Sequence, residues 1–450
     1  MLEKKDYGKN MFDLMTRLFP ICRSITGNGV RKTLKIISEH IKLEIHEVKS
    51  GVKVFDWTVP MEWNINDAYI KNEKGEKIID FKKSNLHILN YSIPINKKIK
   101  LDELKKHLHT IPDQPNYIPY KTSYYNKQWG FCLSYNQFSK LNDEYYEVFI
   151  DSELKNGSLT YGEYFIEGKS KKEILFTCYV CHPSLCNDNL SGVVMCTSLA
   201  ETLTKNKEKL NYSYRFLFIP ETIGAITWLS INEKNVKKIE HGLVLTCLGD
   251  KGNFTYKKTR DGNNEIDNIV QKKLNDKNQK FTVKDFFPTG SDERQFCSPG
   301  FNLPIGGLTR SMYGEFKEYH TSADNLSFVS SDGLEGSFET LVEIILELEN
   351  NFEEIKNKKK IKIKINTDNE IKYLNLNPKC EPQLGKRGLY HTIGGPKNGV
   401  SSNIQGFVWL LNFSDGNYTL AEISKKCQIP ENELMEYAEI LIKNKLLKKI

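Results

Sequence analysis

Residues 173–192 read EILFTCYVCHPSLCNDNLSG, an apolar run that passes into a polar loop and then into a helical pattern. Residues 173–180 lack any alternation of polar and apolar side chains, which is typical of a strand that is buried on both faces. His182 follows the run directly, and Asp188 precedes a predicted helix at 192–204. Ligands of open α/β sheets bind beyond the carboxyl ends of the strands. The stretch therefore predicts a buried strand that carries a histidine and a carboxylate to such an edge.

The same alternation of strand and helix continues on both sides of this stretch. Helical patterns are expected at 8–19, 29–42, 223–231 and 338–348, and strands at 43–48, 214–219 and 242–248. Continuous apolar strands that alternate with helices indicate a mostly parallel sheet with helices on both faces. We predict an α/β fold with a mixed, mostly parallel sheet covered by helices.

Two further parts of the chain have a different texture. Residues 52–150 are rich in Tyr, Trp, Asn and Pro and carry short alternating runs, which predicts a mostly β inserted domain. A polar connection follows at 366–402, and three helical patterns at 403–413, 419–427 and 430–447 resemble a winged helix. We therefore expect a catalytic domain of residues 1–51 and 151–365, an insertion at 52–150, and a linker with a winged-helix domain at 366–450. Alternating Lys and Ile at 358–365 indicate an edge strand.

The composition is that of an ordinary soluble protein. Hydrophobic residues make up 39% of the 450 residues and charged residues 27%, and no run approaches the roughly 20 apolar residues that span a bilayer. The N-terminal residues contain no apolar signal core, so a cytoplasmic location is expected. Scattered basic residues, 64 against 57 acidic ones, favour a solvated surface over a nucleic-acid footprint.

The ten cysteines are expected to be reduced thiols, because several lie inside apolar strand-like runs and no export signal precedes them. Cys178, Cys181 and Cys186 allow a zinc knuckle as an alternative interpretation. Their spacing lacks a matching second pair, which weighs against it.

Four polar side chains come after predicted strands of the same sheet. They are His182, Asp188, Glu221 and Asp250. Zinc takes neutral imidazole and carboxylate ligands and keeps one position for water, whose pKa it lowers. A carboxylate that is not a ligand then accepts the proton of that water, and Glu221 suits this role. The pattern predicts a metal-dependent hydrolase.

Motifs along nearly the whole chain resemble a known superfamily. The segments that carry the resemblance are His182 with Asp188–Gly192, Glu221, Ser291–Phe296, Gly300–Pro304 and Tyr319–Asp324. In this order they are similar to the zinc-dependent aminopeptidase superfamily. The whole chain resembles more closely a bacterial aminopeptidase-like family that has an inserted domain of unknown function and a C-terminal winged helix. Residues 23–27 and 129–132 also resemble that family.

The resemblance implies roles for particular residues. It makes His182 and His320 metal ligands, Asp188 a carboxylate that bridges two metals, and Glu221 the general base. Zinc is the implied cofactor, and a short peptide or an aminoacyl-type small molecule is the implied substrate. The family's bacterial members are associated with polysaccharide-related functions, which adds an amide on a modified sugar to the substrate classes.

The chain departs from the superfamily pattern at three places. The usual His-x-Asp becomes His182-Pro183-Ser184, which removes the carboxylate that orients the imidazole. The usual Glu-Glu pair becomes Glu221-Thr222, and Thr is a poor metal ligand. The later ligand Asp has no clean match, although Asp250 could serve from a displaced position. We therefore expect one firmly held zinc and a second site that is weakened or lost.

Each candidate also has a structural interpretation. The two histidines could be packing residues, Asp188 and Glu221 could be helix caps, and Asp250 has the form of a plain turn. Asp292 and Arg294 are expected to support the site residues from behind or to line the pocket, and Asp324 to hydrogen bond near His320 or begin a turn. An aromatic set is interpreted as core more readily than as pocket wall, and it comprises Tyr124, Tyr125, Trp129 and Phe131.

Two hypotheses from different classes remain open. The first is a zinc-dependent aminopeptidase-like hydrolase with Glu221 as base, in which the insertion restricts access to the site. The second is a weakly active or inactive binding or regulatory protein that reuses the fold. The last predicted helix begins with Glu431, Glu433 and Glu436, which phosphates would repel. We therefore expect the winged helix to contact protein rather than DNA, and the oligomeric state is left open.

Overall fold

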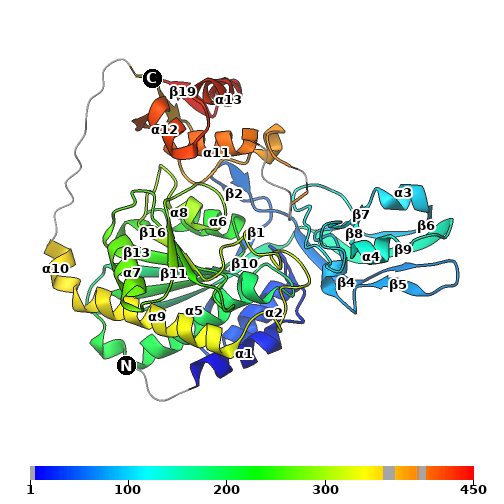
Figure 1. Cartoon of the computed structure of the whole chain (residues 1–450), viewed down its shortest axis with the longest axis horizontal. Helices are drawn as coiled ribbons and strands as arrows, with labels where there is room; N and C mark the ends of the chain where they lie inside the picture. The colour runs from blue at the N-terminus through cyan, green and yellow to red at the C-terminus, as the bar shows by residue number, and fades with distance from the viewer. Residues whose placement is uncertain (1–5, 358–369, 392, 395–401) are drawn as a thin grey trace.

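The computed structural model describes residues 6–357, 370–391, 393–394 and 402–450. Figure 1 shows a central α/β domain with a β-rich lobe on one side and a small domain above it. The predicted edge strand at 358–365 lies outside the described residues. Among the described residues, the search for a helix long and apolar enough to cross a membrane found none.

An eight-stranded mixed sheet forms the centre of the molecule. Neighbouring strands in the middle of the sheet run parallel, whereas β1, β10 and β14 each join an antiparallel neighbour. This confirms the predicted mixed α/β architecture. The strand order is β1 (Glu44–Lys49), β10 (Ser158–Ile166), β12 (Ser213–Ile219), β11 (Glu173–Tyr179), β13 (Ile239–Leu245), β16 (Ile305–Thr309), β14 (Phe254–Lys257) and β15 (Phe281–Lys284).

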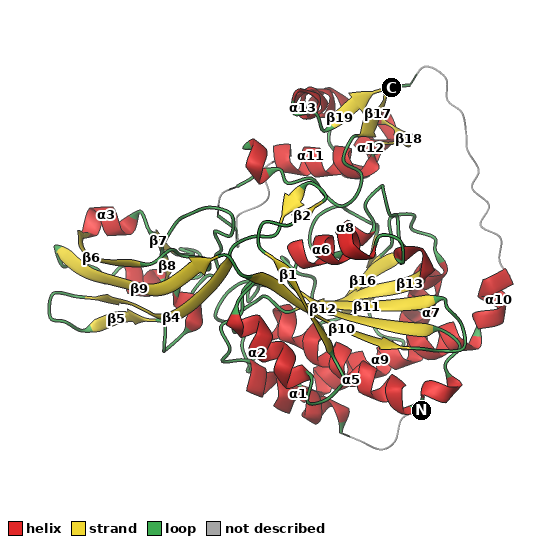
Figure 2. Ribbon diagram, turned by 180° about the vertical axis from the view of Figure 1, so that it is seen from behind, coloured by secondary structure: helices red, strands yellow, loops and turns green. Residues whose placement is uncertain are grey.

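Both faces of this sheet are buried, as the apolar run 173–180 predicts. In β11 the side chains of Phe176 and Cys178 join one core cluster, while Leu175 and Tyr179 join another. This split follows from the two-residue period of a strand. The short α8 (Glu293–Phe296) and α6 (Ile223–Asn232) cover the second face (Figure 2). The first face is covered by α1 (Tyr7–Leu18), α2 (Asn28–Ile37), α5 (Ser191–Lys205), α7 (Glu265–Asp276) and α9 (Ser331–Asn350), and α9 leads into α10 (Phe352–Asn357).

The inserted domain is mostly β, as the sequence indicates. Its main sheet has the order β5 (Lys77–Asp80), β4 (Glu62–Lys71), β9 (Tyr145–Lys155) and β6 (Ile95–Lys100). Strand β9 continues to Lys155, so the insertion ends a few residues beyond the expected boundary at residue 150. The smaller elements are β2 (Lys53–Val54), β3 (Trp57–Thr58), α3 (Leu101–Lys105), β7 (Leu108–His109), β8 (Phe131–Cys132) and α4 (Tyr135–Phe138).

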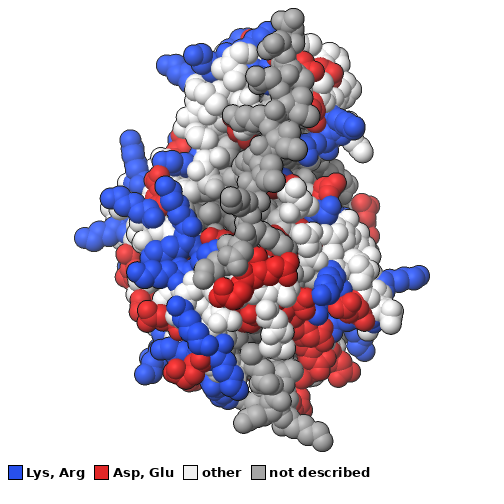
Figure 3. All heavy atoms as spheres, turned by 90° about the vertical axis from the view of Figure 1, so that its left-hand side faces the viewer, with Lys and Arg blue, Asp and Glu red and all other residues white. Residues whose placement is uncertain are grey.

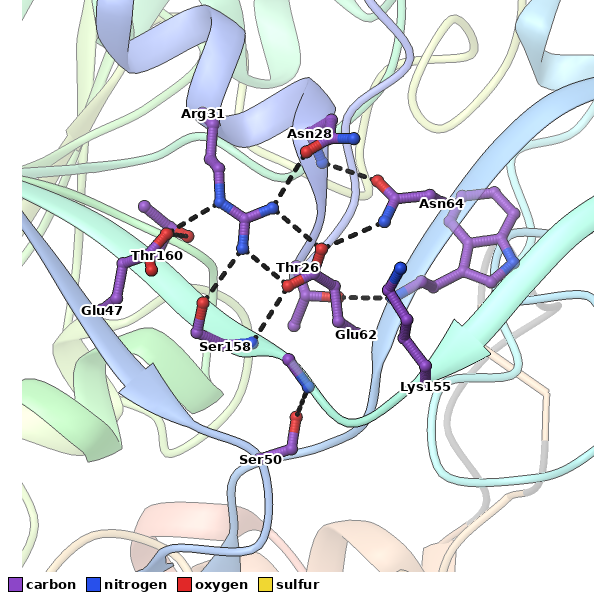
Figure 4. A network of polar contacts seen from close by, with 12 residues as sticks. Thr26, Asn28, Arg31, Glu47, Ser50, Glu62, Asn64, Lys155, Ser158 and Thr160 are labelled. Atoms are coloured by element: carbon purple, nitrogen blue, oxygen red, sulfur yellow. Dashed lines mark hydrogen bonds and ion pairs between the residues drawn. The ribbon is translucent and has the colours of Figure 1, made fainter.

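A partly buried polar network joins the insertion to the catalytic domain (Figure 4). Arg31 on α2 donates to both carboxylate oxygens of Glu62 on β4, at 2.8 and 2.6 Å. Its Nε donates to Glu47 at 2.8 Å, and one Nη donates to Ser158 at 3.0 Å. A planar guanidinium suits such paired contacts. Glu47 and Ser158 lie on β1 and β10 of the central sheet, whereas Glu62 lies on β4 of the insertion. Arg31 therefore ties the central sheet to the main sheet of the insertion.

The C-terminal domain has three helices and a small sheet. The helices are α11 (Ser402–Phe413), α12 (Leu420–Cys427) and α13 (Glu431–Lys443), and the sheet contains β17 (Lys372–Asn375), β18 (Asp415–Thr419) and β19 (Leu447–Lys449). The last helix is shorter than the expected 430–447, because Leu446 and Leu447 turn back into the core and β19 pairs with β17. Buried Arg260 of the catalytic domain binds Asn412 at 3.0 Å and Asp415 at 2.7 Å, which anchors this domain.

Charge is mixed on the surface. Lys and Arg side chains and Asp and Glu side chains are both spread over the face shown in Figure 3. This distribution is that of a solvated surface with both signs interspersed.

The Arg31–Glu62 pair predicts an acid-sensitive stability. The hydrogen bond from Arg31 lowers the pKa of Glu62 from 4.5 to about 2, against a smaller opposing effect of burial. Because the folded pKa lies below the unfolded one, the stabilisation is complete above pH 4.5 and is lost as the pH falls toward 2. Glu62→Gln should cost about 1–3 kcal/mol at pH 7 in urea unfolding.

The difference between wild type and Glu62→Gln should shrink in acid. Glu39→Gln is the matched control, because its ion pair with Arg17 is half exposed and should contribute little. A pH-independent difference, or an equal loss in the control, would contradict this assignment.

Candidate functional site

Two histidines and an aspartate meet beyond the carboxyl end of β11. The ligand atoms of His182, Asp188 and His320 all lie within 4.8 Å of one another. Asp188 Oδ2 is 2.9 Å from His320 Nε2 and 3.9 Å from His182 Nε2. The three side chains come from the loop after β11, the turn before α5, and the loop before α9. The structure thus brings together three of the four predicted ligands.

Neighbouring groups hold Asp188 in place. The Tyr179 hydroxyl donates to Asp188 Oδ1, and the backbone N–H of Asp188 donates to Asp324 Oδ2 at 2.9 Å. Asp324 also accepts from the N–H of Asn187 at 2.6 Å. Asp324 therefore fixes the loop that carries the ligand, a more specific role than the predicted contact near His320. Burial raises the pKa of Asp324 to about 8.

The other ring nitrogen of His182 has an unusual partner. Its Nδ1 lies 3.4 Å from Cys181 Sγ. The fully buried Arg23 donates from Nε to the His182 carbonyl at 3.0 Å. Arg23 belongs to the segment 23–27, so the sequence singled out this segment but not its function. Together these contacts orient the imidazole without a carboxylate.

The donor set fits a metal cation. Asp188 Oδ2 and His320 Nε2 are buried, and neither forms a hydrogen bond of acceptable geometry within the described part of the chain. The two atoms face each other at 2.9 Å without a well-formed hydrogen bond, an arrangement that suits a cation bound by both. Two imidazole nitrogens and one carboxylate oxygen are a zinc donor set.

Electrostatics favour the protonation states that a metal needs. Burial lowers the pKa of His182 to about 4, so its imidazole is neutral at pH 7. Burial opposes the ionisation of Asp188, but the charges of His182 and His320 outweigh it, and the Asp188 pKa lies below its ordinary value. The site therefore offers a neutral histidine beside an ionised carboxylate, as metal binding requires.

Glu221 lies on the open side of the same site. Its Oε2 is 3.9 Å from His182 Nε2, and its side chain retains 25% exposure while Asp188 has none. Burial, and then the charges of Asp292 and Asp188, raise the pKa of Glu221 well above its ordinary value. A carboxyl group with a raised pKa beside a metal-type donor set has the properties of an acid–base group.

Thr222 is turned away from the ligands. Its N–H donates to Asp292 Oδ1, and its Oγ accepts from Arg294, both at 2.7 Å. Thr222 has a φ of 61°, a left-handed conformation that these two contacts hold. Asp292 and Arg294 therefore support the turn that presents Glu221. Burial raises the pKa of Asp292 to about 7.

Asp250 lies outside the ligand group. Its buried carboxylate accepts from Asn187 Nδ2 and from the Ser311 hydroxyl, both at 2.8 Å. It also accepts from the N–H of Gly252 at 2.5 Å. These contacts occupy both oxygens, so Asp250 ties three loops together and we do not include it among the proposed ligands. Asp250 lies in the loop after β13, as expected, but its side chain faces neighbouring loops and not the ligand group.

Cys181 forms a second group of metal-binding type with His182 and Glu221. Burial raises the pKa of its thiol well above the ordinary value. Among the described residues, no group of three potential ligands includes Cys178 or Cys186. All ten cysteines are free, and eight are buried.

Two tyrosines that sequence reasoning did not single out border the histidines. The Tyr319 ring stacks on His320 with centroids 4.0 Å apart. The Tyr120 ring, from the insertion, lies 5.1 Å from the His182 ring and 5.2 Å from the His320 ring. No local pattern marks Tyr120, because its contacts are made across the domain boundary.

The fold is that of zinc aminopeptidases. A zinc aminopeptidase from Bacillus subtilis, BSAP, superposes with a TM-score of 0.54 at 11% identity, covering 77% of this chain and 96% of that one. At this identity the likeness concerns the fold alone.

The chain belongs to the family described as "Domain of unknown function (DUF4910)", which matches residues 12–351. A "winged helix-turn-helix" family matches residues 371–449. A relative from Clostridium acetobutylicum, named "Putative polysaccharide biosynthesis protein with aminopeptidase-like domain", is 56% identical over 98% of this chain and 96% of its own. A crystal structure of a "putative peptidase" from the same organism shares 53% identity with a TM-score of 0.75, covering 98% of this chain and 96% of that one.

The site predicts a single zinc per chain. Elemental analysis after zinc reconstitution and gel filtration should give about one zinc for wild type and almost none for His182→Ala or His320→Ala, which remove a ligand. Asp250→Asn should keep its zinc while losing about 1–3 kcal/mol of stability, because it disturbs buried hydrogen bonds only.

If Asp250→Asn loses its zinc at temperatures where the variant is folded, Asp250 is a zinc ligand. Two zincs in wild type would mean that further groups bind metal.

Proposed function

We propose that the chain is a zinc-dependent, aminopeptidase-like hydrolase that cleaves the amide of a short peptide or an aminoacylated small molecule. The observation that carries the proposal is the group of buried ligand atoms, in which Asp188 Oδ2 lies 2.9 Å from His320 Nε2 without a hydrogen bond of acceptable geometry, with Glu221 beside His182. His182, Asp188 and His320 would hold one zinc. When bound, the ion would polarise the scissile carbonyl and lower the pKa of a water molecule.

Glu221 supplies the proton transfer in this proposal. Its Oε2 takes a proton from the attacking water and passes it to the leaving amine. The Thr222 turn, held by Asp292 and Arg294, keeps the carboxylate on the open side of the ligands. The raised Glu221 pKa makes the protonated form a competent acid in the second step.

The name of one relative supports a narrower substrate class. The Clostridium acetobutylicum relative is named for polysaccharide biosynthesis, which favours an amide on a modified sugar among the small-molecule substrates. Buried free thiols are in keeping with the cytoplasmic location that we propose. The winged helix, whose last helix begins with an acidic turn, would bind a protein partner rather than DNA.

A binding or regulatory protein is the second candidate. The observation that favours it is Thr222, which stands where the superfamily has a glutamate and is engaged by Asp292 and Arg294 instead. This candidate predicts zinc binding without turnover of any aminoacyl or peptide substrate.

Glu221→Gln tests the proposed base. On a panel of aminoacyl amides and sugar amides, the variant should lose at least about a hundredfold in kcat with unchanged zinc content. Since the base acts when ionised and its pKa is raised, wild-type activity should fall with acidification well above the ordinary glutamate range. Glu233→Gln, at the far end of α6, is the matched control.

If Glu221→Gln retains wild-type hydrolysis, Glu221 is not the general base. Zinc binding by wild type with no turnover across the panel would favour the binding protein.

A further inference from the structure

The insertion reaches into the metal site through one segment, residues 118–124. The N–H of Tyr120 donates to the His320 carbonyl at 2.7 Å, and Pro119 and Thr321 form an antiparallel bridge. Ile118 and Ser322 exchange hydrogen bonds at 3.0 and 2.9 Å. This short ladder joins the insertion to the loop that carries a ligand.

His320 needs such support. Its φ of 53° lies in the left-handed region, which residues other than glycine adopt uncommonly. The bond from Tyr120 N–H fixes the carbonyl of this same residue. The insertion therefore stabilises the backbone conformation that directs His320 toward Asp188.

The same segment presents a pair of phenols. The hydroxyls of Tyr120 and Tyr124 lie 3.0 Å apart, and either can donate to the other. Two hydroxyls carry two protons, and their mutual bond uses one. Within the described part of the chain, no acceptor for the other proton is found. One donor is thus left over.

The two phenols differ in their surroundings. Tyr120 is buried against the two imidazoles, whereas Tyr124 is partly exposed and so accessible from outside.

We propose that the inserted domain is a working part of the active site: Tyr124 donates a hydrogen bond to an oxygen of the bound substrate, and Tyr120 positions both Tyr124 and His320. The inference rests on the proposed hydrolase, because the substrate oxygen is that of the scissile or adjoining carbonyl. No local sequence pattern links the mostly β inserted domain to the proposed hydrolysis.

Conservative substitutions in the full-length, zinc-loaded protein test this inference. Tyr124→Phe should lower kcat/KM about tenfold to a hundredfold, the range for one lost hydrogen bond at a developing charge, with zinc content unchanged. Tyr120→Phe should give a similar loss through mispositioning of Tyr124. Tyr125→Phe is the matched control, because its hydroxyl donates to the Thr58 carbonyl at 2.9 Å and its side chain is 40% exposed.

A binding measurement separates this inference from the proposed function. Leucine hydroxamate combines a zinc chelator with an aminoacyl group, and its Kd is measured by titration calorimetry on the same variants. Tyr124→Phe should weaken it at least about tenfold, and Tyr125→Phe should leave it within about twofold.

Equal kcat/KM and equal hydroxamate Kd in wild type and Tyr124→Phe would overturn the inference. Equal loss in Tyr125→Phe would do the same, because the effect would then be general. If wild type turns over no substrate, the hydrolase proposal fails, and weaker hydroxamate binding by Tyr124→Phe alone would still support the contact.

Discussion

The arrangement depends on one fully buried carboxylate, that of Asp188. Asp188 is fully buried, its Oδ1 is bound by Tyr179, and its Oδ2 faces two imidazole nitrogens. An ionised carboxylate is costly to bury unless an opposite charge compensates it. A cation held by Asp188, His182 and His320 would compensate it, which is why we assign the chemistry of the chain to this point.

The surrounding structure acts mainly on the loops that carry these ligands. Three parallel strands of the central sheet, β12, β11 and β13, end at the same edge. Contacts from Arg23, from Asp324 and from the insertion then hold the loops beyond that edge. The Arg31 network in turn fixes the insertion against the sheet. Long-range polar contacts thus hold loops that have few local constraints of their own.

The sequence predicted the sheet, the mostly β insertion and the winged helix because their patterns are local. It also indicated His182, Asp188 and Glu221 as candidates at the edge of the sheet, since each follows or adjoins a buried strand. Asp250 met the same criterion, yet its carboxylate is engaged by the loop residues Asn187 and Ser311. Asp324 and Tyr120 act across separations of 136 and 200 residues, and no periodicity or spacing reports such contacts.

The most direct measurement is X-ray absorption at the zinc edge on the reconstituted protein, because it reports the ligands themselves. A single zinc on His182, Asp188 and His320 predicts nitrogen and oxygen scatterers with two imidazoles, and neither sulfur nor a second metal nearby. A sulfur shell at about 2.3 Å would bring Cys181 into the ligand set, and a metal–metal vector of about 3.5–4 Å would establish a two-metal site; either would contradict the single-zinc centre.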